Sequence, residues 1–193
     1  MLTLMIHRKY LTQIFTLLAC LGLCCASGNA KTNESDAYPE SMIRAAVIFG
    51  ILRFTEWPEN IEESKRVNLC TLGKSSSGET IKRLEQIPSI GNRTVTLSID
   101  VHRERLEQCD AIIVGHQTQV PERLNKSILW ICDECSQVNS KRFAIRLILK
   151  DKRIQFNIDL DQIHQQQLSL NSSLIELAAS CFSSDPAMRM CND

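Results

Sequence analysis

The most reactive arrangement in the sequence is Cys132-Asp133-Glu134-Cys135, two cysteines separated by two acids. A CxxC pair can form a structural disulfide, act as a redox pair or supply half of a zinc site. The acids disfavour the thiolate that thioredoxin-like chemistry needs. Zinc requires two further ligands, of which His116 is the one candidate nearby. We favour a structural disulfide, with a redox-sensitive switch or a metal site as alternatives.

The remaining cysteines depend on how the N-terminus is processed. Removal of an N-terminal signal would delete Cys20, Cys24 and Cys25 and leave an even number. An even set of cysteines in an exported chain indicates disulfides, although the set alone leaves the connectivity open. The cysteines that remain are Cys70, Cys109, Cys132, Cys135, Cys181 and Cys191.

The N-terminus has the order of a secretory signal. Basic residues precede an uncharged apolar run over residues 10–26, and small residues follow it. The run is shorter than the roughly 20 apolar residues of a membrane span. We predict a cleaved signal peptide over residues 1–30, with cleavage after Ala26 or Ala30. Lipoprotein anchoring at Cys20 is the minority alternative.

No catalytic set, metal site or cofactor is predicted. Gly73-Lys74-Ser75 follows an expected strand, but a phosphate loop needs an earlier glycine where the chain has Asn68. No serine, histidine and acid spacing rises above chance, and Glu56, Asp159 and Asp161 are expected to be exposed charges. The formal net charge is +0, which argues against a nucleic-acid partner.

These residues must be positioned by a chain that alternates strands with helical segments. Short apolar runs rich in β-branched residues predict strands over 67–73, 93–99, 109–115 and 128–132. We expect helices over 79–87, 103–108, 121–127 and 174–181, with a charged surface connection over 59–66. Such alternation is typical of βαβ units with parallel strands.

Two further strands, over 144–149 and 154–160, flank a charged turn and predict a hairpin. The predicted fold is α/β: a single domain over residues 38–193 with a mostly parallel, Rossmann-like sheet flanked by helices and a late antiparallel hairpin. Residues 31–37 are a flexible lead-in.

Parallel strands end at one edge of a sheet, so the loops that follow them meet there. Ser75 to Gly78, His116 to Gln119 and Asp133 to Cys135 are expected to share this edge. Ligands of open α/β sheets usually bind at the carboxyl ends of the strands.

The opening helix, expected within residues 41–58, is apolar on two sides and is expected to stop at Trp57-Pro58. Core packing is the simplest interpretation of this pattern. The alternative is that some side chains form a dimer or partner surface, for which the candidates are Ile48, Leu52, Phe54 and Trp57.

The ordered set of these segments resembles the YfiR family of bacterial periplasmic proteins. The stretches that carry the resemblance are residues 44–58, 67–75, 109–115, 128–133, 145–161 and 168–178. The resemblance implies an α/β fold, location in the periplasm and a regulatory rather than enzymatic role. It also supports pairing of Cys70 with Cys109, two positions that a parallel sheet could bring together.

The resemblance further implies that the protein inhibits an inner-membrane diguanylate cyclase by binding its periplasmic sensor region, which lowers cyclic di-GMP. An outer-membrane OmpA-like lipoprotein would sequester the protein and relieve the inhibition. A sensor kinase is an alternative partner. The alternative functions are a periplasmic small-molecule-binding sensor module and a thiol redox protein that uses Cys132 and Cys135.

Overall fold

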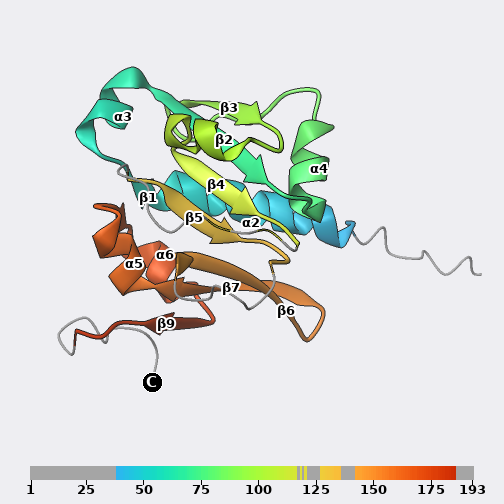
Figure 1. Ribbon diagram of the computed structural model, residues 1–193. Helices are drawn as coiled ribbons and strands as arrows, with labels where there is room; N and C mark the ends of the chain where they lie inside the picture. Colours follow the sequence, from blue (N-terminus) through green and yellow to red (C-terminus); the bar gives the residue numbers. More distant parts are fainter. Residues whose placement is uncertain (1–37, 117, 119, 121–126, 136–141, 186–193) are drawn as a thin grey trace, which may run out of the picture. The chain divides into compact units, whose positions relative to one another are not determined.

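The computed structural model describes residues 38–116, 118, 120, 127–135 and 142–185, which belong to one compact unit (Figure 1). The predictions for the signal peptide and the lead-in, for the helix over 121–127 apart from Ser127, and for Cys191 lie outside these residues. Among the helices of the described ranges, none is both long enough and apolar enough to cross a membrane.

A seven-stranded sheet in the order β3-β2-β4-β5-β6-β7-β9 forms the centre of the unit. Neighbouring strands are parallel except β6 and β7, which form an antiparallel hairpin. The predicted mostly parallel α/β sheet with a late hairpin is confirmed. The strands are β2 (Arg66–Leu72), β3 (Thr94–Ser98), β4 (Ala111–Val114), β5 (Leu129–Cys132), β6 (Ile145–Lys150), β7 (Arg153–Asp159) and β9 (Ser180–Phe182).

Helices flank this sheet, and the longest of them, α2, runs behind β4 and β5 in the view of Figure 1. A separate two-stranded sheet pairs β1 (Thr55–Glu56) with β8 (Ser169–Leu170). The helical elements are α2 (Glu40–Phe54), α3 (Glu59–Ser64), α4 (Ser76–Lys82), the 3₁₀ helix η1 (Arg103–Gln108), α5 (Leu160–Gln165) and α6 (Ser172–Glu176).

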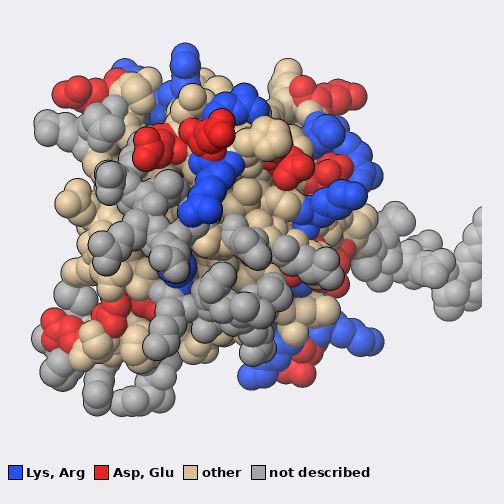
Figure 2. All heavy atoms as spheres, viewed as in Figure 1, with Lys and Arg blue, Asp and Glu red and all other residues tan. Residues whose placement is uncertain are grey.

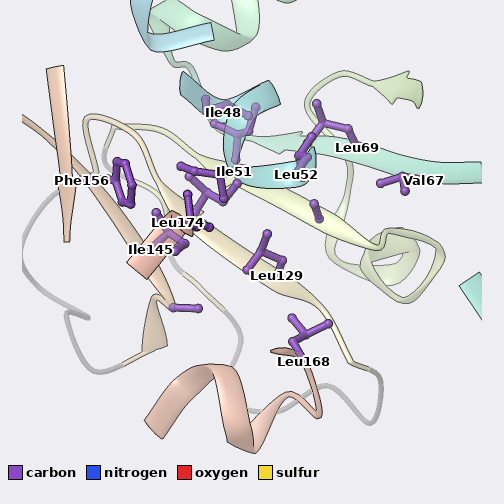
Figure 3. Packing of buried hydrophobic residues seen from close by; sticks show 14 of the residues in the cluster. Ile48, Ile51, Leu52, Val67, Leu69, Leu129, Ile145, Phe156, Leu168 and Leu174 are labelled. Atoms are coloured by element: carbon purple, nitrogen blue, oxygen red, sulfur yellow. The ribbon is translucent and has the colours of Figure 1, made fainter. Parts of the chain in front are cut away.

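The sheet is buried on both faces, which is why its central strands are apolar throughout. All residues of β4 and β5 are buried. Ile113 and Ile131 face the larger core beneath α2, whereas Ile112 and Trp130 face a second core that includes Leu106 of η1. Figure 3 shows Ile48, Ile51 and Leu52 of α2 within the larger core, near Leu129 and Ile145 of the sheet.

The opening helix ends at Phe54, so the predicted stop at Trp57-Pro58 is wrong. Thr55 has an extended backbone, and its hydroxyl donates to the Ile51 carbonyl at 2.8 Å. The Asn171 amide donates to the Phe54 carbonyl at 3.0 Å, where β1 pairs with β8. A contact from far along the chain therefore ends the helix before the proline.

Three other boundaries differ from the predictions. The expected connection over 59–66 contains the helix α3. The helix expected over 79–87 begins at Ser76, because the Ser75 hydroxyl caps it by accepting from the Gly78 amide at 3.1 Å, and it ends at Lys82. The closing helix, expected over 174–181, is capped by Asn171 and ends at Glu176, and the chain then forms β9 beside β7.

Two disulfides join described residues, Cys70–Cys109 and Cys132–Cys135. Cys70 lies in β2, and Cys109 follows η1 just before β4, so the first disulfide crosslinks the second core. Its sequence separation is 39 residues, against 3 for the second. Cys181 is also disulfide-bonded.

Because the Cys70–Cys109 disulfide closes the longer loop, it should stabilise the domain more. Replacing Cys70 and Cys109 together by alanine should lower the free energy of unfolding by about 4 kcal/mol on the chain-entropy model. The matched pair Cys132→Ala/Cys135→Ala should lose only about 1.5 kcal/mol on the same model. Urea denaturation without reductant measures both, and equal losses would contradict the loop-length account.

Candidate functional site

The segments that follow β2, β4 and β5 meet at the carboxyl edge of the sheet, toward α4 in Figure 1. The His116 amide donates to the Lys74 carbonyl at 2.9 Å, and the Gly115 amide donates to the Leu72 carbonyl at 3.0 Å. Ser76 bonds Glu134 across the same edge. The edge therefore gathers the loops that the sequence placed there, except Gln117 and Gln119, which are not described.

Two glycines allow the first two turns to pack this closely. A Cβ atom on Gly115 would collide with the Lys74 carbonyl, and one on Gly73 would collide with the Thr118 hydroxyl. Gly73 also has a φ of +73°, which L side chains rarely adopt. Neither position can hold a larger residue without moving the turns apart.

A buried carboxylate lies at the centre of this edge. Asp133 is fully buried, and its Oδ1 accepts from Nη1 of Arg44 at 2.7 Å. Its second oxygen accepts from the hydroxyl of Ser77, which is also fully buried. Asp133 thus joins the end of β5 to both α2 and α4.

Arg44 is the cation that balances this carboxylate. It is only 6% exposed, although it carries a charge, and its Nε donates to Glu40 at 2.7 Å. Burial opposes the charge of Arg44, but the hydrogen bonds and negative charges of Glu40 and Asp133 outweigh it and raise the pKa of the guanidinium. Arg44 is therefore charged at neutral pH.

Glu134 makes a second link to α4. Its carboxylate accepts from the Ser76 amide at 2.8 Å and from the Ser76 hydroxyl at 2.9 Å. His116 lies farther away, with Nε2 3.7 Å from the Glu134 carboxylate. The backbone of Glu134 is left-handed, with a φ of 62°. This turn allows consecutive acids to reach different residues of one helix.

The Cys132–Cys135 disulfide encloses this turn. Cys132 is the last residue of β5 and is 2% exposed, so it does not occupy the helix start that activates a thioredoxin-like cysteine. Within the described ranges, no group of His, Cys, Asp and Glu side chains could hold a metal ion. The geometry is that of a crosslink that shapes the Asp133-Glu134 turn.

The candidate partner surface needs correction. Ile48 and Leu52 are fully buried and Trp57 is 6% exposed, because α2 packs against the sheet and the chain turns inward after β1. These side chains cannot meet a partner in this structure. Phe54 is 36% exposed and remains a candidate.

Asp159 and Asp161, which the sequence analysis expected to be exposed charges, have defined hydrogen-bond partners. Asp159 caps α5 by accepting from the Gln162 amide at 3.0 Å, and burial raises the pKa of its carboxyl. Asp161 accepts from the Ser183 hydroxyl and the Ser184 amide, and these bonds hold the pKa of its carboxyl below its usual range. Both acids organise the chain locally.

Sequence reasoning missed the roles of Arg44, Ser77 and Asp133. One signal was present, since an arginine within an apolar helix and an acid directly after a buried strand each need a partner when buried. Their separation of 89 residues gave no indication that they pair.

Comparison with known proteins shows which family the chain belongs to. A family model described as YfiR/HmsC-like matches residues 41–179. The match begins in α2 and ends just before β9, so it covers the buried ion pair and the carboxyl edge. No curated protein matches the chain.

The buried pair generates a stability prediction. Arg44→Met leaves the Asp133 carboxylate buried without its cation and should lower the free energy of unfolding by about 3–5 kcal/mol. Adding Asp133→Asn removes that charge, so the double variant should regain at least about 1 kcal/mol. Urea denaturation at pH 7 measures both.

The control is Arg66→Met, which changes an exposed arginine of β2 and should alter stability by less than about 0.5 kcal/mol. If Arg44→Met and the double variant were equally destabilised, uncompensated charge would not be the cause.

Proposed function

Because the chain belongs to the YfiR/HmsC-like family, we propose that it inhibits an inner-membrane diguanylate cyclase by binding the cyclase's periplasmic sensor region. The inhibition lowers cyclic di-GMP. The observation that carries the proposal is the family match over residues 41–179. Membership supports a regulatory rather than catalytic role, in the periplasm and in cyclic di-GMP signalling.

The proposal includes the processing of the chain. Residues 1–30 act as a signal peptide, residues 31–37 form a lead-in, and residues 38–193 are the regulatory domain. An outer-membrane OmpA-like lipoprotein that binds the domain would compete with the cyclase and relieve the inhibition. A sensor kinase in place of the cyclase would be regulated by the same binding step.

The exposed side of α2 is the surface best suited to this binding. At 100° per residue, the buried residues of the helix fall on one side, facing the sheet. The opposite side is mostly apolar: Met42, Ile43 and Phe54 are 39%, 41% and 36% exposed, with the exposed charge of Arg53 beside them. Ala46 and Gly50 lie between them on the same side. We call Met42, Ile43, Ala46, Gly50 and Phe54 the outer face of α2.

Apolar surface of this kind favours a protein partner. Soluble proteins seldom leave a contiguous apolar strip facing water, and such strips mark interaction sites. Gly50 has no atom near the position of a Cβ, and Ala46 is small, so a partner helix or loop could approach the backbone of α2. The sensor region would supply apolar side chains for Ile43 and Phe54.

Inhibition through this face is a shift in the populations of two cyclase states. The protein restrains the enzyme only if it binds the inactive arrangement of the sensor region more tightly than the active one. A tenfold preference corresponds to about 1.4 kcal/mol, which the burial of one large apolar side chain can supply.

The test introduces charge into the outer face. Ile43→Asp and Phe54→Asp should each weaken binding to the purified sensor region by roughly 30-fold, as for an interface hot spot of about 2 kcal/mol. In a host that carries the chain and its cyclase, each variant should raise cyclic di-GMP toward the level of the gene deletion.

The matched control is Leu149→Asp, on the β6–β7 hairpin. Leu149 is 53% exposed, so the substitution adds the same charge to a more accessible site away from α2. It should leave binding and cyclic di-GMP unchanged. If deletion of the gene left cyclic di-GMP unchanged, the proposed function would be wrong. If only Leu149→Asp weakened binding, the partner would bind at the hairpin rather than at the outer face of α2.

A further inference from the structure

The strand order places a crevice at the carboxyl edge of the sheet. From β2 the chain crosses to β3 on one side and then returns to β4 on the other side of β2. The chain leads from β2 to β3 and from β4 to β5, on opposite sides of this pair of strands, and such a switch in strand order is where open α/β sheets bind ligands. A crevice of ≈ 340 Å³ lies there, lined by both loops, by α4 and by Glu134.

Two cations border this crevice. Lys74 follows β2 and Arg83 follows the last turn of α4, and both side chains are exposed. Among the described residues, neither has a carboxylate within ion-pair distance. Figure 2 shows basic and acidic side chains intermingled over the part of this face that α4 occupies in Figure 1.

Two acids, Glu79 and Glu134, also line the crevice. Both carboxylate oxygens of Glu134 accept hydrogen bonds from Ser76, and His116 Nε2 lies 3.7 Å from the same carboxylate, so Glu134 already has partners within the wall. Glu79 is half-buried and can accept a hydrogen bond from a ligand hydroxyl. The groups left to meet a ligand are the two unpaired cations and the Glu79 carboxylate, with His116 at the rim beside Glu134.

The wall behind these groups is rigid. Gly73 and Gly115 hold the two loops in contact, and the Asp133 network fixes α4 against the end of β5. A ligand would meet a preformed crevice and would not have to order it, which lowers the entropic cost of binding.

From this geometry we propose that the crevice binds a small hydroxylated organic anion, whose carboxylate or phosphate lies between Lys74 and Arg83. A hydroxyl group of the ligand donates to Glu79. The site lies at the edge of the sheet and shares no residue with the outer face of α2. It goes beyond the proposed function and does not depend on it, since binding is measured on the protein alone.

The test is a titration of the purified full chain, with its disulfides oxidised, followed by amide resonances in two-dimensional NMR. The probes are malate, glycerol 3-phosphate, inorganic phosphate and uncharged glycerol. Malate or glycerol 3-phosphate should cause saturable shifts at Lys74, Ser76 and His116, and glycerol should cause none. Whichever of malate and glycerol 3-phosphate binds more tightly shows whether the crevice prefers a carboxylate or a phosphate.

The variant Lys74→Gln/Arg83→Gln should weaken that binding at least tenfold, the effect of losing one charge-assisted hydrogen bond of about 1.4 kcal/mol. Lys82→Gln is the matched control, because Lys82 is an exposed lysine of α4 outside the crevice. It should bind as the unchanged chain does.

Absence of saturable shifts with all the anions would overturn the proposal. So would equal binding by the double variant and the unchanged chain, or inorganic phosphate binding as tightly as both organic anions. None of these results would bear on cyclase inhibition, which is read from cyclic di-GMP and the sensor-region assay.

Discussion

The buried carboxylate of Asp133 constrains much of this domain. A carboxylate without water or a cation is strongly destabilising in a protein interior, so Asp133 requires Arg44 and Ser77 in fixed positions. Arg44 ties the first turns of α2 to the end of β5, and Ser77 ties the first turn of α4 to the same carboxylate. The arrangement of both helices on the sheet follows from one charge that must be neutralised.

This constraint gives the Cys132–Cys135 disulfide a structural effect. A disulfide across so few residues removes little entropy from the unfolded chain, so global stabilisation is a minor part of its effect. Its larger effect is local, because it holds a left-handed residue between the ends of a tight turn. That turn sends Asp133 inward and Glu134 toward Ser76, which two acids in an extended strand could not do together.

The fold was largely predictable, and the site only in outline. The runs at 67–73 and 109–115 could be recognised as strands because strands buried on both faces are rich in apolar residues. The carboxyl edge followed from the parallel arrangement of those strands. The end of α2 was not predictable, because Asn171 ends the helix from more than a hundred residues away. The burial of Ile48 and Leu52 was equally ambiguous, since a helix that is apolar on all sides does not indicate which side faces the sheet.

A helix near the start of a chain usually frays, but α2 is held at both ends. Arg44 ties its first turns to Asp133, and the Phe54 carbonyl is bonded to Asn171 beside the β1–β8 pair. Local opening of α2 would break contacts with distant parts of the domain, so the helix should open only together with the sheet. Its outer face is consequently presented by a rigid rod, and a partner that docks there has little backbone disorder to remove.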